Sequence, residues 1–380
     1  MRTLSEFLLI GLLITTSAVA NEVERATPPD ITHYCATELS VTDSGLDYIQ
    51  TVDLNRRGQV LGWGYLGGGV KVFLWERKHG YKFIDELAHE LEIPTGAGSG
   101  FNDRGQIVGT QPIEPDGAFL RAVIWQQGKG LQFLEPAPGD DNSVAVAINN
   151  RGEVVGITGP YPNESTLGER PVIWDCHGRV TVIPLLPGST GGRPYAMNDA
   201  GQVIGATDAS GVVLGYIWDR KSGLRAIEGL ISGRPGILHA INDRGEGVGA
   251  SSFFNGNSGS HAIFWSEATG AVDLGDLPGG IENSFASDIN NHRQIVGYAT
   301  SQSGGAAVIW DSDGQIHNLN DLLVRDEPDV QSLYLGDARK INDAGWITAS
   351  SYDGGQQFRT FVLKPARRSP AGTYDCPSGK

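Results

Sequence analysis

The stretch His239-Ala240-Ile241-Asn242-Asp243-Arg244-Gly245-Glu246-Gly247-Val248-Gly249 decides the fold, because the chain carries seven versions of it. In the most regular copies an asparagine is followed by glycines three and seven positions later. The seven asparagines are Asn55, Asn102, Asn149, Asn198, Asn242, Asn290 and Asn342, separated by 44 to 52 residues. Such a period is typical of repeat proteins in which each copy forms one supersecondary unit.

Each copy is predicted to form four short antiparallel strands. An apolar stretch such as 239–241 precedes the asparagine, whose side chain can bond the backbone two residues on in a turn. The following Gly suits the left-handed residue of a turn with a G1 bulge. A second strand follows, and a third ends in Trp75, Trp125, Trp174, Trp218, Trp265 or Trp310, with Leu363 in the seventh copy. Another turn and a fourth strand complete the unit.

A four-stranded sheet of this size has no partner of its own to cover its apolar face. Sheets packed face to face in a ring give a β-propeller of 4–8 blades. We therefore predict an all-β, seven-bladed β-propeller. An open β-solenoid is the structural alternative, but its rungs are shorter than these repeats.

The two ends of the chain are expected to meet in the last blade. The seventh copy stops after its third strand, Thr360 to Leu363, and the segment from Ala36 to Val41 can supply the missing fourth strand. Cys35 and Cys376 lie on either side of the repeats, so we pair them in a disulfide and leave Cys176 as a free thiol. The alternative is two unpaired termini. The propeller is placed at 35–366, a flexible segment at 21–34 and a C-terminal tail at 367–380.

The first twenty residues have the pattern of a secretory signal peptide. Arg2 is basic, residues 7–14 are apolar or Gly, and Ala18-Val19-Ala20 forms a small-x-small cleavage site. Eight such positions are far fewer than the ~20 needed to span a bilayer. We expect a secreted or periplasmic protein without a membrane span.

Charge and motifs exclude several function classes. The net charge of −15 disfavours a nucleic-acid partner. The eight histidines are scattered, and no pair of cysteines has metal-ligand spacing. Each asparagine turn has four residues and one acid at most, whereas a calcium-binding EF-hand loop needs about twelve residues. We expect no metal, no cofactor and no catalytic residues, and we expect a monomer.

The repeat core Ile-Asn-Asp/Asn-x-Gly-x-Ile/Val-Val-Gly, followed by Ala-x-x-Trp, resembles the bacterial HAF-type extracellular repeat over roughly residues 50 to 365. His261-Ala262-Ile263-Phe264-Trp265 is the nearest match to its lettering. Proteins of that family look secreted and have no assigned function, so the resemblance implies location and architecture. This sequence departs from the pattern at Arg293, which replaces a turn Gly. A non-Gly residue at positive φ costs about 1–2 kcal/mol, so we expect a reshaped turn there.

Candidate binding residues come from the variable loops. The distance from each asparagine to the end of its second strand is constant, whereas the loops after the second and fourth strands vary in length. Both loops lie at the same end of a meander, so they gather on one face, and binding residues favour loops on a rigid scaffold. The polar and aromatic residues predicted there are Asp140, Asp141, Tyr161, Asn163, Arg193, Arg234, Phe253, Phe254, Asn255, Asn257 and Glu282.

Three functions remain open at this point. The first is non-enzymatic binding of a glycan or an extracellular protein through this loop face. The second is a polysaccharide hydrolase or lyase with carboxylates in a central funnel, and the third is a purely structural surface protein. His239, on an innermost strand, either lines the central channel or packs in the core.

Overall fold

The computed structural model describes residues 32–67, 69–84, 100–113, 119–160, 168–254, 258–281, 283–302, 304–326, 328–352, 358–369 and 372–376. The predicted signal peptide and most of the segment 21–34 lie outside these ranges. So do the candidate residues Tyr161, Asn163, Asn255, Asn257 and Glu282.

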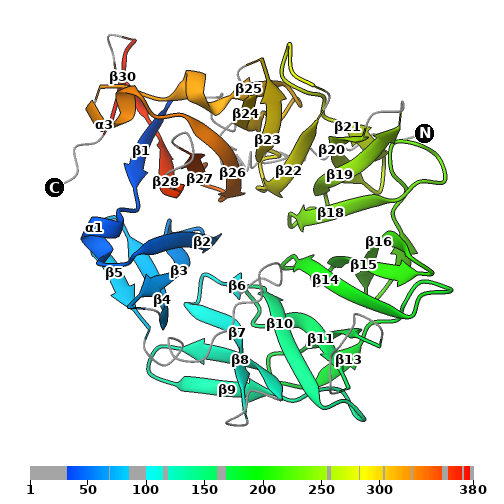
Figure 1. Ribbon diagram of the computed structural model, residues 1–380. Coiled ribbons are helices and arrows are strands. Elements are labelled where there is room, and N and C mark those ends of the chain that lie inside the picture. The colour runs from blue at the N-terminus through cyan, green and yellow to red at the C-terminus, as the bar shows by residue number, and fades with distance from the viewer. Residues whose placement is uncertain are drawn as a thin grey trace, which may run out of the picture. The chain divides into compact units, whose positions relative to one another are not determined.

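The described residues form seven four-stranded antiparallel sheets arranged in a ring, which confirms the predicted seven-bladed β-propeller (Figure 1). We number the blades along the chain. Blade 1 contains β2(Tyr48–Leu54), β3(Val60–Leu66), β4(Gly69–Glu76) and β5(Gly80–Phe83), and blade 2 contains β6(Gly100–Phe101), β7(Gln106–Pro112), β8(Leu120–Gln126) and β9(Gly130–Leu134). Blade 3 contains β10(Asn142–Ile148), β11(Val154–Gly159), β12(Arg170–Trp174) and β13(Val180–Val182).

The next three blades repeat this order. Blade 4 contains β14(Gly191–Met197), β15(Val203–Ala209), β16(Val212–Asp219) and β17(Gly223–Ala226). Blade 5 contains β18(Gly236–Ile241), β19(Gly247–Phe254), β20(Ser258–Ser266) and β21(Gly270–Asp273). Blade 6 contains β22(Ser284–Ile289), β23(Ile295–Ser301), β24(Gly304–Trp310) and β25(Ile316–Asn318). In every blade the first of these strands is innermost, and in Figure 1 these strands surround the propeller axis.

Blade 7 is built from both ends of the described chain. It contains β26(Leu335–Ile341), β27(Ile347–Tyr352) and β28(Phe358–Pro365), and β1(Tyr34–Glu38) is its fourth strand. Antiparallel pairing places Ala36 opposite Leu363, so the N-terminal segment supplies the missing strand as predicted. The strand begins two residues earlier than the sequence suggested, at Tyr34.

The predicted disulfide is present and joins β1 to the segment after the last blade. Cys35 lies in β1, and Cys376 follows a small hairpin of β29(Arg367–Arg368) and β30(Tyr374–Asp375). His33 stacks on Tyr374, with ring centroids 3.9 Å apart. Cys176 is exposed and free, as expected.

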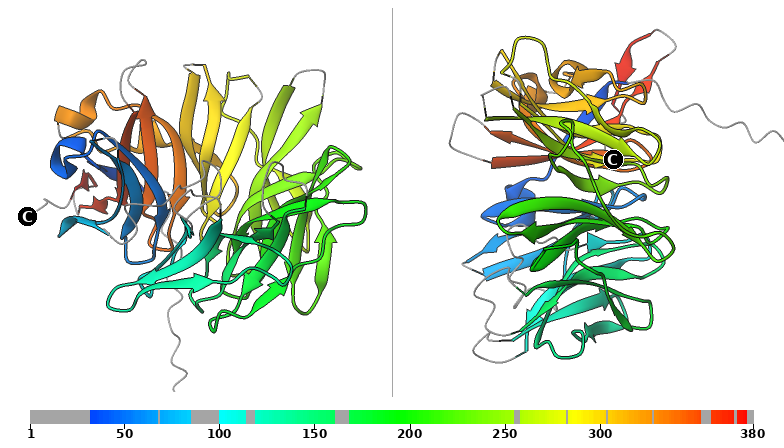
Figure 2. Two further views of the ribbon diagram at one scale, coloured as in Figure 1. Left: turned by 60° about the horizontal axis from the view of Figure 1, so that its bottom comes forward. Right: turned by 90° about the vertical axis from the view of Figure 1, so that its right-hand side faces the viewer.

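Within the ranges that the structure describes, three short helices lie in connections: α1(Val41–Ser44), η1(Leu319–Leu322) and α3(Pro328–Gln331). Within the described residues, no helix has both the length and the apolar character needed to cross a membrane. Figure 2 shows the blades from two further directions, with strands of neighbouring blades packed face to face.

The core lies between the blades. The tryptophan that ends each third strand is at most 8% exposed in all six copies. Trp174 packs among residues of blade 2 and blade 3, and its indole N–H donates to the Glu135 carbonyl at 2.7 Å. Each large aromatic side chain buries 150–250 Å², so these tryptophans supply much of the contact that one sheet cannot make alone.

Candidate functional site: the two ends of the propeller axis

The seven repeated turns meet around the axis at one end of the propeller, which we call the turn face. Every repeat asparagine is between 3% and 5% exposed. In each copy the Oδ1 atom accepts a hydrogen bond from the backbone N–H four residues later, for example Glu246 at 3.0 Å. The bond to the N–H two residues later, which the sequence predicted, forms as well, as at Arg244.

The same asparagines also join neighbouring blades, which the sequence analysis did not foresee. At six of the seven interfaces the side-chain Nδ2 atom donates to the backbone carbonyl of the asparagine in the next blade, as Asn149 does to Asn198 at 3.2 Å. One asparagine side chain therefore forms hydrogen bonds with the backbone of its own turn and with the backbone of the turn in the next blade. This double use explains why the position is asparagine in all seven copies, since Asp has no N–H to donate.

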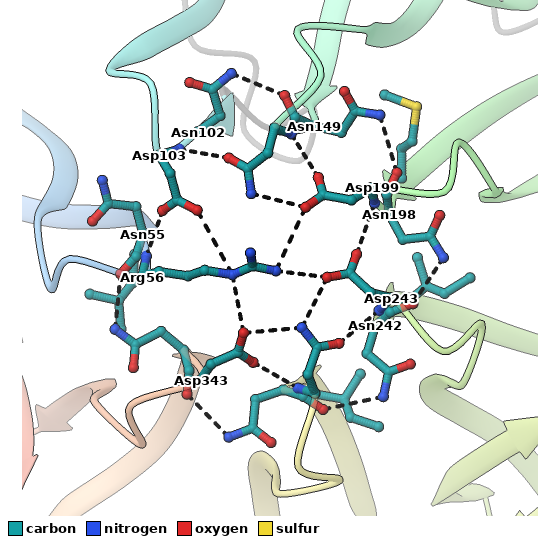
Figure 3. Close-up of a pocket in the computed structure, with 18 of the residues that line it drawn as sticks. Asn55, Arg56, Asn102, Asp103, Asn149, Asn198, Asp199, Asn242, Asp243 and Asp343 are labelled. Atoms are coloured by element: carbon teal, nitrogen blue, oxygen red, sulfur yellow. Dashed lines mark hydrogen bonds and ion pairs between the residues drawn. The ribbon is translucent and has the colours of Figure 1, made fainter. Parts of the chain in front are cut away.

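The residue after each asparagine contributes to a second circle, which we call the axial ring (Figure 3). Its members are Arg56, Asp103, Asn150, Asp199, Asp243, Asn291 and Asp343. Six successive backbone N–H groups donate to the side-chain oxygen of the next member, at 2.7 to 2.9 Å. The Arg56 side chain has no oxygen that could accept a hydrogen bond from the Asp343 backbone N–H. The circle is therefore interrupted at the interface between blades 7 and 1.

Arg56 also offsets part of the negative charge of the ring, which contains four aspartates and this one arginine. Its Nη2 atom lies 2.7 Å from Asp243 Oδ2, and its Nε atom lies 3.1 Å from Asp343 Oδ2. Asp199 Oδ2 lies 3.6 Å from Nη2, and Asp103 Oδ2 lies 3.8 Å from Nε. Burial lowers the pKa of Arg56, but these four carboxylates outweigh it and the pKa is raised. The guanidinium therefore lies at the centre of a shallow cavity of about 190 Å³ lined by all seven turns (Figure 3).

Arg293 does not reshape its turn, contrary to the expectation from sequence. It has a φ of 63°, and its N–H bonds the Asn290 carbonyl at 3.1 Å as the glycines do in the other copies. Its guanidinium pairs with the buried Glu246 of blade 5, with Nε to Oε1 at 2.7 Å. This ion pair offsets the backbone strain.

The opposite end, which we call the loop face, carries one group of aromatic side chains, and a second group lies within the innermost strands of blades 4 to 6. The first is the aromatic cluster of Tyr48, Trp63, Tyr65 and Phe358, from blades 1 and 7. Trp63 and Tyr65 meet edge to face with centroids 5.4 Å apart, and Tyr48 lies 5.6 Å from Phe358. Tyr65 is 42% exposed. Arg339 lies 5.8 Å above the Phe358 ring.

The second group is the aromatic row of Tyr195, His239 and Phe285, on the innermost strands of blades 4, 5 and 6. The His239 ring lies 5.5 Å from Tyr195 and 4.7 Å from Phe285. Burial lowers the pKa of His239 to about 4, so the ring is neutral at pH 7 and acts as an aromatic surface. In Figure 1 these strands, β14, β18 and β22, lie across the axis from β2.

A repeated β-bulge explains why such residues face the axis. The register of the innermost strand shifts at the third residue before the asparagine in six blades, at positions that include Tyr195, His239 and Arg339. A bulge re-aims a side chain and ends regular pairing. The bulged residue differs between blades: it is Tyr195, His239 or Arg339 in three of them, and the buried Val146 in blade 3.

The predicted loop residues within the described ranges mostly form structural contacts. Asp140 pairs with Arg170 at 2.7 Å and accepts a hydrogen bond from Thr158. Arg193 pairs with the buried Glu169, with Nη2 to Oε1 at 2.7 Å, and its charge acts on the neighbouring Tyr195. The Asp141 carbonyl accepts a hydrogen bond from Arg121.

The other described candidates, Arg234, Phe253 and Phe254, are not part of either aromatic group. Arg234 is exposed in the loop before β18. The backbone of Phe253 and Phe254 ends β19, paired with Gly259 and Ser258. The structure thus brings Arg193 to the aromatic row and leaves the remaining described candidates apart.

Carboxylates near the axis are committed to contacts between blades. Asp53 Oδ2 accepts from the Phe101 N–H at 3.0 Å, and Asp288 Oδ2 accepts from the Ile341 N–H at 2.9 Å. Burial raises the pKa of the Asp288 carboxyl, and Lys340 on the next blade offsets part of the rise. Among the described residues, no group of three or more His, Cys, Asp or Glu side chains is placed to hold a metal ion.

The sequence analysis considered His239 on an innermost strand but missed the rest of both aromatic groups, because its candidate binding residues came from loops. The alternation of Trp63 and Tyr65 was an available signal, since residues two apart in a strand share one face. Aligning the seven copies on their asparagines would also have shown Tyr195, His239 and Arg339 at one position.

Comparisons with known proteins support the architecture. No family model matches the chain, and no curated protein matches it. Among solved structures, an oligogalacturonate lyase in complex with manganese is similar over 87% of this chain and 93% of its own, with 12% identity and a TM-score of 0.57. The β-propeller domain of the Trilobed protease from Pyrococcus furiosus is similar over 83% of this chain and 95% of its own, with 8% identity and a TM-score of 0.54. At such identities the likeness shows the β-propeller fold alone.

Proposed function

We propose that this protein is an exported, non-enzymatic propeller that binds a glycan at its loop face. The observation that carries the proposal is the aromatic cluster together with the aromatic row. Ligand sites are lined by aromatic side chains with a few polar groups that fix orientation. Here the exposed Tyr65 belongs to a cluster of partly buried rings. Arg339, which pairs with Asp337, lies over the Phe358 ring, and Gln50 accepts a hydrogen bond from the Tyr48 hydroxyl.

A glycan fits this surface better than a flat protein partner does. Sugars present polar edges and apolar ring faces, which match half-buried aromatic rings bordered by amides and charged groups. The rings come from blades on both sides of the axis, so a ligand of several sugar units can contact both groups. The acidic net charge favours a neutral glycan over a polyanionic one.

Two features support export. The Cys35–Cys376 disulfide is typical of proteins from oxidising compartments, and the chain begins with a signal-peptide pattern. Membership of the HAF-type extracellular repeat family is part of this proposal, and it rests on the repeat pattern of the sequence.

The test is a screen of neutral and acidic oligosaccharides against the purified mature chain, followed by calorimetry. Tyr65→Ala and Tyr48→Ala should each weaken binding about 10-fold, because each removes a ring from the aromatic cluster. Phe133→Ala is the matched control, since Phe133 is 47% exposed on the outer strand β9. It should bind with unchanged affinity.

The same screen separates the other two functions. Release of new reducing ends or unsaturated products would show hydrolysis or elimination and would replace the binding proposal. No saturable binding to any glycan would support a structural role. Equal loss of affinity in Phe133→Ala would show that the aromatic cluster is not the site.

A further inference from the structure

The turn face offers an internal comparison, because seven equivalent spaces lie between the turns of neighbouring blades. In six of them a side chain of the preceding blade covers the turn residue. The covering residue is the fourth after the asparagine. In blade 3 that residue is Glu153, and Arg151, which pairs with it, lies nearest to Gly201. Thus Trp346 covers Gly58, Gln202 covers Gly245, and Glu246 pairs with Arg293.

Blades 1 and 2 are the exception. By the same rule Gln59 should cover Gly105, yet nothing lies within 4 Å of the position that a Gly105 side chain would occupy. Gln59 accepts a hydrogen bond from Asn55 at 2.7 Å, as Gln106 and Gln202 do from their own asparagines, but it also donates to Glu76 of its own blade. The result is a cavity of about 360 Å³, which we call the blade 1–2 cleft. Its size lies within the range of small-molecule sites.

The blade 1–2 cleft is basic in a protein that is acidic overall. Arg57, Lys82 and Arg104 line it together with one carboxylate, Glu76. Hydrogen bonds from Gln59 and then His79 lower the pKa of Glu76, so that carboxylate is ionised and already engaged. The three cations have no carboxylate within 4 Å among the described residues. Lys82 contacts the Gln127 amide oxygen at 2.8 Å, and Arg104 reaches a carbonyl at 3.4 Å.

A second departure occurs at the same interface. The indole N–H groups of Trp174 and Trp310 donate to carbonyls of the preceding blade at 2.7 Å and 2.9 Å. Trp125, which lines the blade 1–2 cleft, is 4% exposed, and its Nε1 atom has no hydrogen-bond partner among the described residues. A buried donor without a partner is uncommon in folded proteins. The interface with the open cleft thus also holds a buried donor without a partner among the described residues, as is the case for Asn142 and Tyr216 elsewhere in the ring.

We propose that the blade 1–2 cleft binds a small organic anion of about monosaccharide size. Leu74, Phe101 and Trp125 supply an apolar floor, and Arg57, Lys82 and Arg104 supply charge for a carboxylate. Guanidinium groups recognise carboxylates through paired N–H bonds, which makes arginine the suitable residue for this task. The site lies on the turn face, so it is separate from the glycan surface proposed above.

The test uses calorimetry or saturation-transfer NMR with glucuronate as the probe. Glucose is the uncharged comparison, and sodium sulfate is the inorganic anion. Glucuronate should bind saturably and glucose should not. Arg57→Ala and Arg104→Ala should each weaken glucuronate binding about 10-fold, and raising the salt concentration should weaken it further, because the contacts are ionic.

Arg244→Ala is the matched control. Arg244 holds the same turn position in blade 5, beside a space that Arg293 and Glu246 fill. It should bind glucuronate like the parent chain. Melting temperatures of all variants within about 2 °C of the parent would show that they are folded, and Lys82→Gln supplies a further variant if one of the arginine variants is not.

Three results would overturn the proposal: no saturable binding of glucuronate, equal loss in Arg244→Ala, or sulfate binding as tightly as glucuronate. Neutral-glycan binding at the loop face should be unchanged in Arg57→Ala, so failure of either proposal can be recognised without the other.

Discussion

The turn face and the loop face belong to the same seven blades, yet they are built by different rules. On the turn face each blade contributes the same asparagine, which bonds its own turn and, at six of the seven interfaces, the next blade. The aromatic cluster comes from blades 1 and 7 and the aromatic row from blades 4, 5 and 6, and among these rings only Tyr65 is strongly exposed. The comparison teaches that the repeated residues join the blades, whereas the aromatic groups on which the proposed binding rests do not recur from blade to blade. It also predicts how substitutions at the two faces should differ.

The largest effect is expected for Asn149→Ala on the turn face. This change leaves the Arg151 and Glu153 N–H groups without their acceptor and removes the bond to the Asn198 carbonyl. Buried unsatisfied groups cost ~1–3 kcal/mol each, so we expect a loss of about 3 kcal/mol in the free energy of unfolding. Denaturant titration measures it. A loss below ~1 kcal/mol would mean that the asparagines are not what joins the blades.

A smaller effect is expected for Arg56→Ala in the axial ring. Removal of the guanidinium leaves four carboxylates facing one another, but Arg56 is 46% exposed, so solvent already screens the charges. We expect a loss of about 1 kcal/mol, which decreases at high salt. Arg56→Lys keeps the charge and should lose less. Equal stability of the alanine and parent chains at low salt would contradict the role given to Arg56.

The turn face should also make stability depend on pH. Burial would raise the pKa of Glu246, but the bonds from Arg293 and Asn242 outweigh it and the pKa is lowered. A carboxyl whose pKa is lower in the folded than in the unfolded state stabilises the protein above the unfolded pKa, ~4.3 for Glu. That stability is lost as the pH falls through the folded value. Melting temperatures from pH 7 to pH 3 should therefore fall less steeply in Glu246→Gln than in the parent.

The smallest effect on stability is expected on the loop face. Tyr65→Ala should change the free energy of unfolding by no more than ~0.5 kcal/mol, because its ring is exposed. Denaturant titration of Tyr65→Ala and Asn149→Ala in one series measures the effect of a loop-face and of a turn-face substitution under the same conditions. A loss as large as that of Asn149→Ala would show that the aromatic cluster is part of the core.

The fold was predictable to a large extent because the same strand and turn pattern occurs seven times in the sequence. The asparagine spacing gave the number of blades, Trp174 and its equivalents marked the third strands, and the short seventh copy pointed to closure by the N-terminal strand. The cysteine pairing followed from the same reasoning. The expectation of a reshaped turn at Arg293 failed, because the ion pair with Glu246 comes from a residue 47 positions away.

The candidate sites were much less predictable. Arg56, Asp103, Asp199, Asp243 and Asp343 are each ordinary turn residues in sequence, and only the ring brings them around one guanidinium. The blade 1–2 cleft depends on which way Gln59 turns, and nothing in the local sequence distinguishes Gln59 from Gln106 or Gln202.

By itself the sequence determined the four-stranded blade, the number of blades and the closure of the ring by the N-terminal strand. These features depend on local turn chemistry and on a fixed period of apolar residues. Only the tertiary structure decided which side chains meet across blades, which spaces are filled and which stay open. Those outcomes depend on contacts between residues about 47 or more positions apart, and the orientation of a side chain there is set by its neighbours in space rather than by its neighbours in the chain.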